Sequence, residues 1–208
     1  EQMLKFYLFA IVGVMCGVRG HETMNGSLFL NNDNAYNILV CIRCLQQLER
    51  ASPDAIYWNY ISARAQQLEL PFAQTTDITI ARIACLIRAT KETSTELLSA
   101  WQSLGPDLRT SLQEHFLADG MMEKAIVFEH LPSFFANCRK NSCIGLRTAL
   151  VMLVELREAL QKRINQKAER LWTVNILDIA SFAEKVRSPH VFEALLWNLR
   201  VIVLVGGR

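Results

Sequence analysis

Hydrophobic residues recur three and four positions apart along most of this chain, which is the period of an amphipathic α-helix. In residues 34–50, Ile38, Ile42 and Leu45 follow this spacing, with Asn, Arg and Gln between them. No segment sustains the alternation of apolar and polar residues that is typical of a half-buried strand. The pattern predicts helices near residues 4–18, 34–50, 53–68, 78–89, 96–104, 106–119, 121–131, 132–138, 143–166, 174–186 and 191–204.

Several of these helices begin at residues that favour a helix N-terminus. Ser52-Pro53 combines an N-cap residue with a Pro at the first helical position. Thr93 and Glu96 have the spacing of a capping box. The apolar run 201–205 is equally compatible with a short strand, so the end of the chain has two interpretations.

Amphipathic helices joined by short connections favour an all-α fold. We predict a compact multi-helix bundle of at least seven helices, without a sheet of three or more strands. A short α-solenoid of helix pairs is the alternative, but the sequence shows no repeat at a fixed period. The longest apolar stripe predicts a central helix over 143–166, in which Leu150, Leu153 and Val154 are buried and Arg157 faces solvent.

Residues 1–20 form a separate apolar segment, in which Lys5 is the one charge between Leu4 and Val18. The run is shorter than the roughly 20 residues of a membrane span. A basic residue, an apolar run and small residues after it are typical of a secretory signal peptide. The alternative is the first buried helix of the domain, in a chain that is a fragment. Either interpretation predicts a helix with apolar contacts, to the domain or to a membrane.

We expect residues 21–208 to form a single helical domain. A further boundary is considered near 139–142, because composition and charge both change there. Residues 21–130 contain 8 Lys and Arg against 13 Asp and Glu, whereas residues 131–208 contain 12 against 6. The net charge of +2 argues against broad nucleic-acid binding, and 51% hydrophobic residues predict a packed interior.

Two imidazoles and three carboxylates occur close together in the sequence, at Glu114, His115, Asp119, Glu129 and His130. His115 and Asp119 are four residues apart, so they share one face of the predicted helix. Such groups bind divalent metal ions and activate water. They give candidate catalytic residues (His115, Asp119 and His130) and candidate metal ligands (the same three with Glu129). The alternative is structural: Asp119 caps the next helix and the other carboxylates are solvated.

Cys41 and Cys44 have CxxC spacing, and Cys138 with Cys143 would complete a four-thiolate zinc site. However, the first pair falls within a predicted helix, where no turn brings the sulfurs together. Packing of reduced Cys in an apolar core is therefore the preferred interpretation, ahead of zinc or redox chemistry.

No motif in the sequence identifies a reaction or a cofactor. The preferred hypothesis is a non-catalytic helical protein-interaction module or subunit, which binds a protein partner through exposed apolar residues. Phe134-Phe135 next to Arg139 is a candidate surface anchor, and residues 4–18 are a candidate membrane contact. The alternatives are a metal-dependent hydrolase and a helical carrier of an apolar ligand. The compartment stays open between the cytoplasm and, if residues 1–20 are a signal or anchor, secretion or a membrane.

Overall fold

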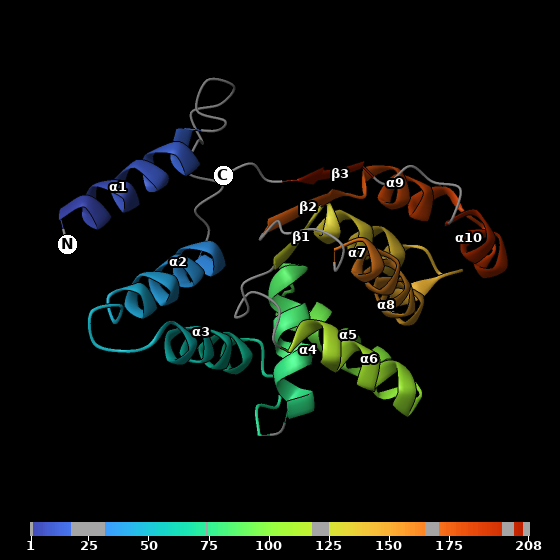
Figure 1. Ribbon diagram of the computed structural model, residues 1–208, viewed down its shortest axis with the longest axis horizontal. Coiled ribbons are helices and arrows are strands. Elements are labelled where there is room, and N and C mark those ends of the chain that lie inside the picture. The colour runs from blue at the N-terminus through green and yellow to red at the C-terminus, as the bar shows by residue number, and fades with distance from the viewer. Residues whose placement is uncertain are drawn as a thin grey trace. The chain divides into compact units, whose positions relative to one another are not determined.

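The computed structural model describes residues 2–17, 32–73, 75–117, 125–164, 171–196 and 202–205. Helices hold most of these residues, as Figure 1 shows, which confirms the predicted all-α, multi-helix class. The helices of this part are α1 (Gln2–Gly17), α2 (Asn32–Leu45), α3 (Pro53–Gln67), α4 (Thr75–Leu86), α5 (Lys91–Gln102), α6 (Pro106–Phe116), α7 (Leu131–Lys140), α8 (Gly145–Ile164), α9 (Leu177–Lys185) and α10 (Pro189–Leu196). Tertiary contacts divide the chain into two units, Glu1–Ile56 and Tyr57–Arg208, and the division falls within α3.

The first unit contains α1, α2 and the first turn of α3. α1 confirms that the apolar N-terminal segment is helical. α2 ends at Leu45, and residues 46–50, which were predicted to continue the helix, form hydrogen-bonded turns instead. α3 begins at Pro53 as predicted, because the backbone N–H of Ala55 donates to Ser52 Oγ at 3.3 Å.

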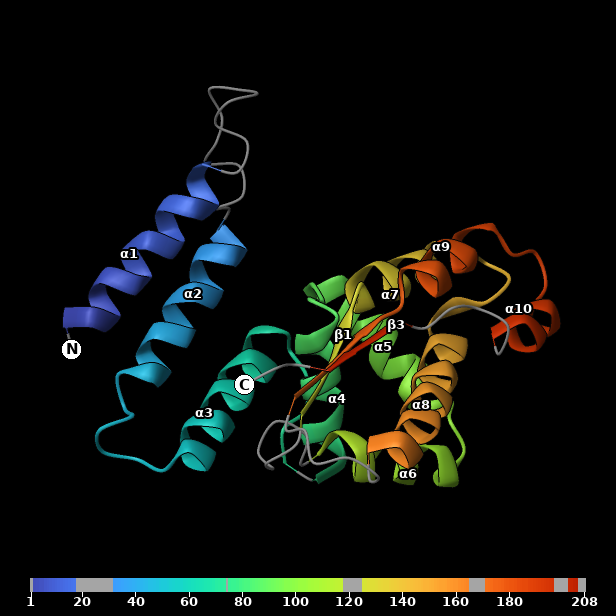
Figure 2. The same cartoon turned by 45° about the horizontal axis from the view of Figure 1, so that its top comes forward.

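The core of the second unit is built around α8, which packs against α5, α6 and α7 (Figures 1 and 2). Leu150, Leu153 and Val154 are 0%, 0% and 3% exposed, which confirms the predicted central helix. Arg157 was predicted to face solvent, and that prediction is wrong because its side chain is buried. Its position four residues after Leu153 and three after Val154 places it on the buried side of α8.

The second unit also contains a three-stranded sheet of β1 (Ala125–Glu129), β2 (Leu171–Asn175) and β3 (Ile202–Val205). β1 and β2 are parallel, whereas β2 and β3 are antiparallel. The predicted absence of such a sheet and the predicted helix over 121–131 are therefore wrong, while the strand interpretation of 201–205 is confirmed. Ile126 and Phe128 are buried and Val127 is exposed, so β1 does alternate. Five residues are too few to separate this alternation from a helical period.

α7 and α9 pack side by side, and two asparagine side chains join them. One asparagine lies within α7, and the other is the residue that caps its C-terminus. Asn137 Nδ2 donates to the Ala180 carbonyl at 2.8 Å. Asn141 Nδ2 donates to the carbonyls of Ala183 at 2.9 Å and Val186 at 2.7 Å. Residue numbers increase together along both helices, so the helices run parallel. The junction between α7 and α8, where the sequence suggested a boundary, thus lies inside the second unit.

α5 begins five residues before the predicted start at Glu96. The backbone N–H of Thr93 donates to Thr90 Oγ1 at 3.3 Å, so Thr90 is the N-cap and Thr93 lies in the first turn. The capping box predicted from Thr93 and Glu96 is therefore wrong. Glu96 instead binds the side chain of Arg139 on α7.

Candidate functional site

His115 lies on α6 and is half-buried, as the apolar spacing of that helix predicts. Burial lowers the pKa of the His115 imidazole below its ordinary value, and the charge of Arg157 lowers it further, against the opposing effect of Glu158 and Glu114. Arg157 is itself buried in α8, which packs on α6. A guanidinium next to this imidazole also disfavours the approach of a metal ion.

The shifted pKa predicts that stability depends on the pH through His115. The unfolded chain binds the proton more readily, so this contribution is present above about pH 6.5 and is lost as the pH falls through the lower folded-state pKa. We expect the free energy of unfolding to decrease between about pH 7 and about pH 5 more in the wild type than in His115→Gln. Urea denaturation at both pH values tests this, and equal decreases would contradict it.

Glu129 and His130 lie at the end of β1, and both side chains are exposed. His130 has a left-handed backbone, with φ of 68°, and precedes the first residue of α7. Asp119, the remaining member of the predicted metal site, lies outside the described residues. Among the residues that the structure describes, no group of three or more His, Cys, Asp and Glu side chains is placed to hold a metal ion. The metal site stays a prediction without support from this part of the chain.

The cysteine side chains do not share one environment. Cys44 and Cys138 are buried, which agrees with core packing, and burial raises the pKa of the Cys138 thiol to about 12. Burial also raises the pKa of Cys85, against the opposing charge and hydrogen bond of Arg64. Cys41 is exposed, so the core-packing interpretation is wrong for this residue. A zinc site needs deprotonated thiols as ligands, and the burial of Cys138 disfavours the deprotonated form of its thiol.

Phe134 and Phe135 do not form a surface anchor. They are 0% and 2% exposed, and the Phe134 ring lies edge-on to Phe135 at 5.6 Å between centroids. Phe134 also stacks on Phe192 of α10 at 6.3 Å. The pair therefore belongs to the core, and the predicted anchor is wrong because the apolar face of α7 is turned inward.

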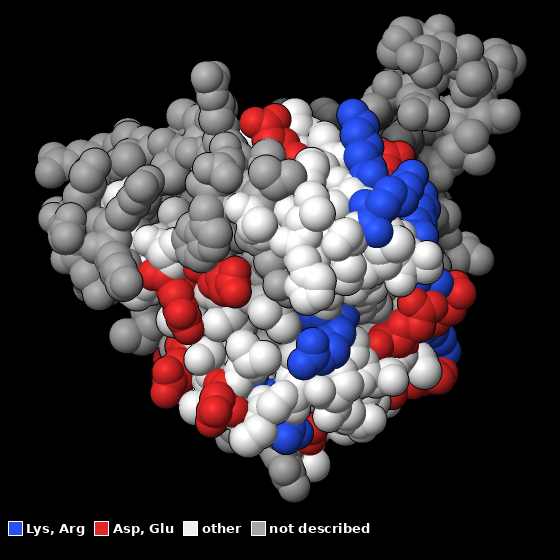
Figure 3. Space-filling view, turned by 90° about the vertical axis from the view of Figure 1, so that its right-hand side faces the viewer, with Lys and Arg blue, Asp and Glu red and all other residues white. Residues whose placement is uncertain are grey.

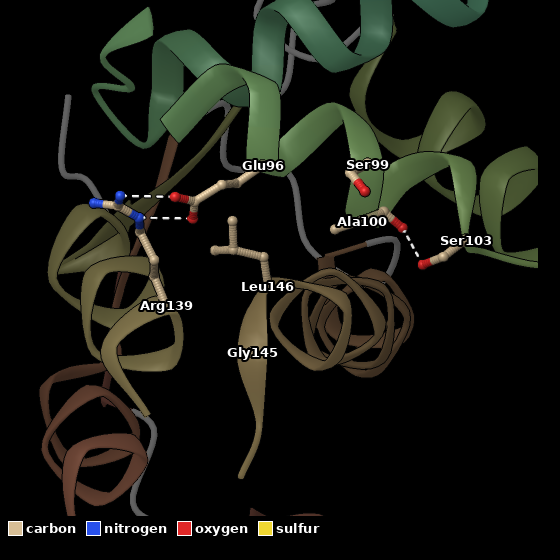
Figure 4. A pocket seen from close by; sticks show the side chains of 7 residues that line it. All are labelled: Glu96, Ser99, Ala100, Ser103, Arg139, Gly145 and Leu146. Carbon is tan, nitrogen blue, oxygen red and sulfur yellow. Dashed lines mark hydrogen bonds and ion pairs between the residues drawn. The ribbon is translucent and has the colours of Figure 1, made fainter. Parts of the chain in front are cut away.

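A pocket of about 310 Å³ lies between α5 and the α7–α8 junction (Figure 4). Arg139 extends across it and binds both carboxylate oxygens of Glu96, with Nε–Oε2 at 2.7 Å and Nη2–Oε1 at 2.8 Å. Arg139 Nη2 also lies 2.8 Å from Glu92 Oε1. The hydrogen bond from Arg139 lowers the pKa of the Glu96 carboxyl. Arg139, Glu92 and Glu96 thus form an ion-paired clamp between α5 and α7. The positive charge of the guanidinium is compensated by these two carboxylates.

A second pocket of about 340 Å³ lies on the α9 side of the same junction. Its lining residues are mostly polar or charged: Asn137, Lys140, Asn141, Ser142, Cys143, Glu184 and Arg187. Arg187 Nη1 donates to the carbonyls of Glu184 at 3.3 Å and Val186 at 3.2 Å. Cations at the C-termini of α7 and α9 complement the helix dipoles. The positions of Lys140 and Arg187 in this pocket are thus explained by the helix ends beside them.

Charges of both signs lie together on the surface of the second unit. On the face that Figure 3 shows, Lys and Arg side chains lie beside Asp and Glu side chains, with uncharged atoms between them.

Among the described residues, the large apolar side chains with the highest exposed fractions are on α1. Met3, Phe6, Tyr7 and Phe9 are 85%, 73%, 59% and 78% exposed. Among the α1 side chains that the structure describes, Leu8 alone is half-buried. The interpretation as the first buried helix stays a prediction, because Leu4 and other apolar side chains of α1 lie outside the described ones. No helix of the described residues has both the length and the apolar character needed to cross a membrane.

The sequence analysis named residues 139–142 as a possible boundary but did not predict the contacts that they make at the α7–α8 junction. Arg139 and its partner Glu96 are far apart in the sequence, so no local spacing connects them. Asn141 follows a basic dipeptide at a predicted helix end, which is an ordinary position for a solvated polar residue. The exposed apolar stripe of α1, in contrast, was visible in the sequence as an apolar run.

Comparisons with known proteins give no family assignment for this chain. No family model matches the sequence, no curated protein matches it, and no solved structure matches the fold.

Proposed function

We propose that this chain is a non-catalytic helical interaction module that docks onto a partner protein through α1. The observation that supports this most is the exposure of Met3, Phe6, Tyr7 and Phe9 on one helix of 16 residues. Exposed apolar residues that adjoin one another are typical of surfaces that a partner covers, because water is a poor solvent for them.

The spacing of these residues indicates how α1 would dock. Met3, Phe6 and Tyr7 occupy positions i, i+3 and i+4, which is the spacing of the anchors by which a helix lies in an apolar groove. Leu8, the half-buried residue, points to the opposite side of the helix. Two of the three anchors are aromatic, a residue type that is enriched among energetically dominant interface residues. A groove on a folded protein is therefore the partner surface that fits α1.

The other two functions have less support from the described residues. A hydrolase needs converged ligands, and among the described residues no group of three or more His, Cys, Asp and Glu side chains is placed to hold a metal ion. A carrier needs an enclosed apolar cavity, whereas the two pockets at the α7–α8 junction are open and contain many polar groups. The net charge of +2 also favours a protein partner over a nucleic acid.

Photo-crosslinking tests the proposal directly. A benzophenone amino acid at Tyr7 is expected to give one discrete protein adduct in cells, whereas the same group at the exposed Gln102 of α5 is expected to give none. Phe6→Ser should remove the adduct at Tyr7. The same variant should change the free energy of unfolding by no more than about 0.5 kcal/mol, because Phe6 is exposed.

Two outcomes would contradict the proposal. Adducts with lipid alone, together with Phe6-dependent co-sedimentation with phosphatidylcholine vesicles, would show that α1 inserts into a membrane surface. A protein adduct that persists in Phe6→Ser would show that the stripe does not dock.

A further inference from the structure

We propose that Cys41 and Cys44 form a reversible dithiol–disulfide site at the C-terminal end of α2. This site goes beyond the proposed docking of α1 and does not depend on it. Both cysteines lie in the last turn of α2, three residues apart, and both are reduced in the structure.

The helix brings the two residues within reach of a disulfide. Residues three apart in an α-helix have Cα atoms about 5 Å from each other. A disulfide joins Cα atoms roughly 4.4 to 6.8 Å apart. The Cβ atoms in a regular helix are about 5 to 6 Å apart, compared with about 3.8 Å in a disulfide, so the turn has to tighten.

The last α-helical hydrogen bond across Cys44 runs from the N–H of Gln46 to the Ile42 carbonyl at 2.9 Å, and directly after it the backbone departs from the α-helix in the direction that is needed. The N–H of Gln47 donates to the Cys44 carbonyl at 3.0 Å, and the N–H of Leu48 donates to the Leu45 carbonyl at 3.2 Å. Both bonds have the three-residue spacing of a 3₁₀-helix, in which side chains three residues apart eclipse each other. Extending this spacing by one turn toward Cys41 would align the two Cβ atoms.

The different exposure of the two thiols assigns them different roles. Cys41 is exposed and can attack an external disulfide, whereas Cys44 is buried and is the resolving thiol. With glutathione disulfide as the oxidant, the Cys41 thiolate breaks the S–S bond, forms a mixed disulfide and releases one glutathione thiolate. The Cys44 thiolate then attacks the Cys41 sulfur and releases the second glutathione. In total, two protein thiols and one glutathione disulfide give one protein disulfide and two glutathione thiols.

The chain provides a specific readout, because trypsin cleaves after Arg43, between the two cysteines. Complete cleavage separates them into peptides 20–43 and 44–50. After equilibration with glutathione disulfide and alkylation of the remaining thiols, we expect these two peptides to be joined, in protein that runs as a monomer without reductant. Reduced glutathione should separate them again.

Single variants test the order of the steps. Cys44→Ser should stop at a stable glutathione adduct on Cys41, whereas Cys41→Ser should lose both the adduct and the cross-link. Cys143→Ser is the matched control, which should form the cross-link as the wild type does. A stable adduct on Cys41 in the wild type, an unreacted Cys41, or a cross-link from Cys41 to another cysteine or another chain would each overturn the proposal.

Discussion

Replacing Leu153 with Ala is expected to lower the free energy of unfolding by about 2 to 5 kcal/mol. Leu153 is 0% exposed and lies on α8, which packs against α5, α6 and α7. Truncation removes buried methyl groups and leaves a cavity that these neighbours cannot close without moving one another. Urea denaturation followed by circular dichroism measures the change.

A matched Leu→Ala variant separates burial from the change of residue. Leu177 is the first residue of α9 and is 47% exposed. We expect Leu177→Ala to cost no more than about 0.5 kcal/mol, in the range of surface substitutions. Equal, small effects at Leu153 and Leu177 would show that α8 does not form the centre of the second unit.

Asn141→Ala is expected to cost about 3 kcal/mol, because it removes the side-chain donor of the Ala183 carbonyl and leaves Arg187 Nη1 as the side-chain donor to the Val186 carbonyl. Asn141 is buried, and its Nδ2 donates to the carbonyls of Ala183 and Val186. Its Oδ1 also accepts from the backbone N–H of Cys143 at 3.1 Å. One side chain thus connects the end of α7, the start of α8 and the end of α9.

Asn137→Ala is the control for this prediction, since Asn137 is half-buried and makes one hydrogen bond to α9, at the Ala180 carbonyl. We expect it to cost about 1 kcal/mol. Urea denaturation of both variants gives the comparison. A cost at Asn141 that does not exceed the cost at Asn137 would show that the junction does not depend on the Asn141 contacts.

The clamp of Arg139 with Glu92 and Glu96 connects the same junction to α5. Because these groups are partly exposed to solvent, their contribution to stability is small, in the range of surface ion pairs. The contact of the guanidinium with both carboxylate oxygens of Glu96 has the two-point geometry typical of an Arg–carboxylate pair.

Local sequence determined the helices of this protein and part of its core. The spacing of Leu150, Leu153 and Val154 predicts the buried face of α8, because the helical period places these apolar side chains on one side of the helix. Ser52-Pro53 predicts the start of α3 for the same reason, since the cap bonds groups three residues apart. The apolar character of α1 was likewise evident from the residues of that segment alone.

Only the tertiary structure decided which surfaces those helices leave uncovered and which polar groups they bury. β1 forms because Ala125–Glu129 pairs with Leu171–Asn175, a contact between segments too far apart for any local period to encode. Arg157 is buried because α6 covers its side of α8, although its charge alone predicts exposure. Contacts between distant segments decide these features. The periodic pattern of the sequence shows only which face of each helix is apolar enough to be buried.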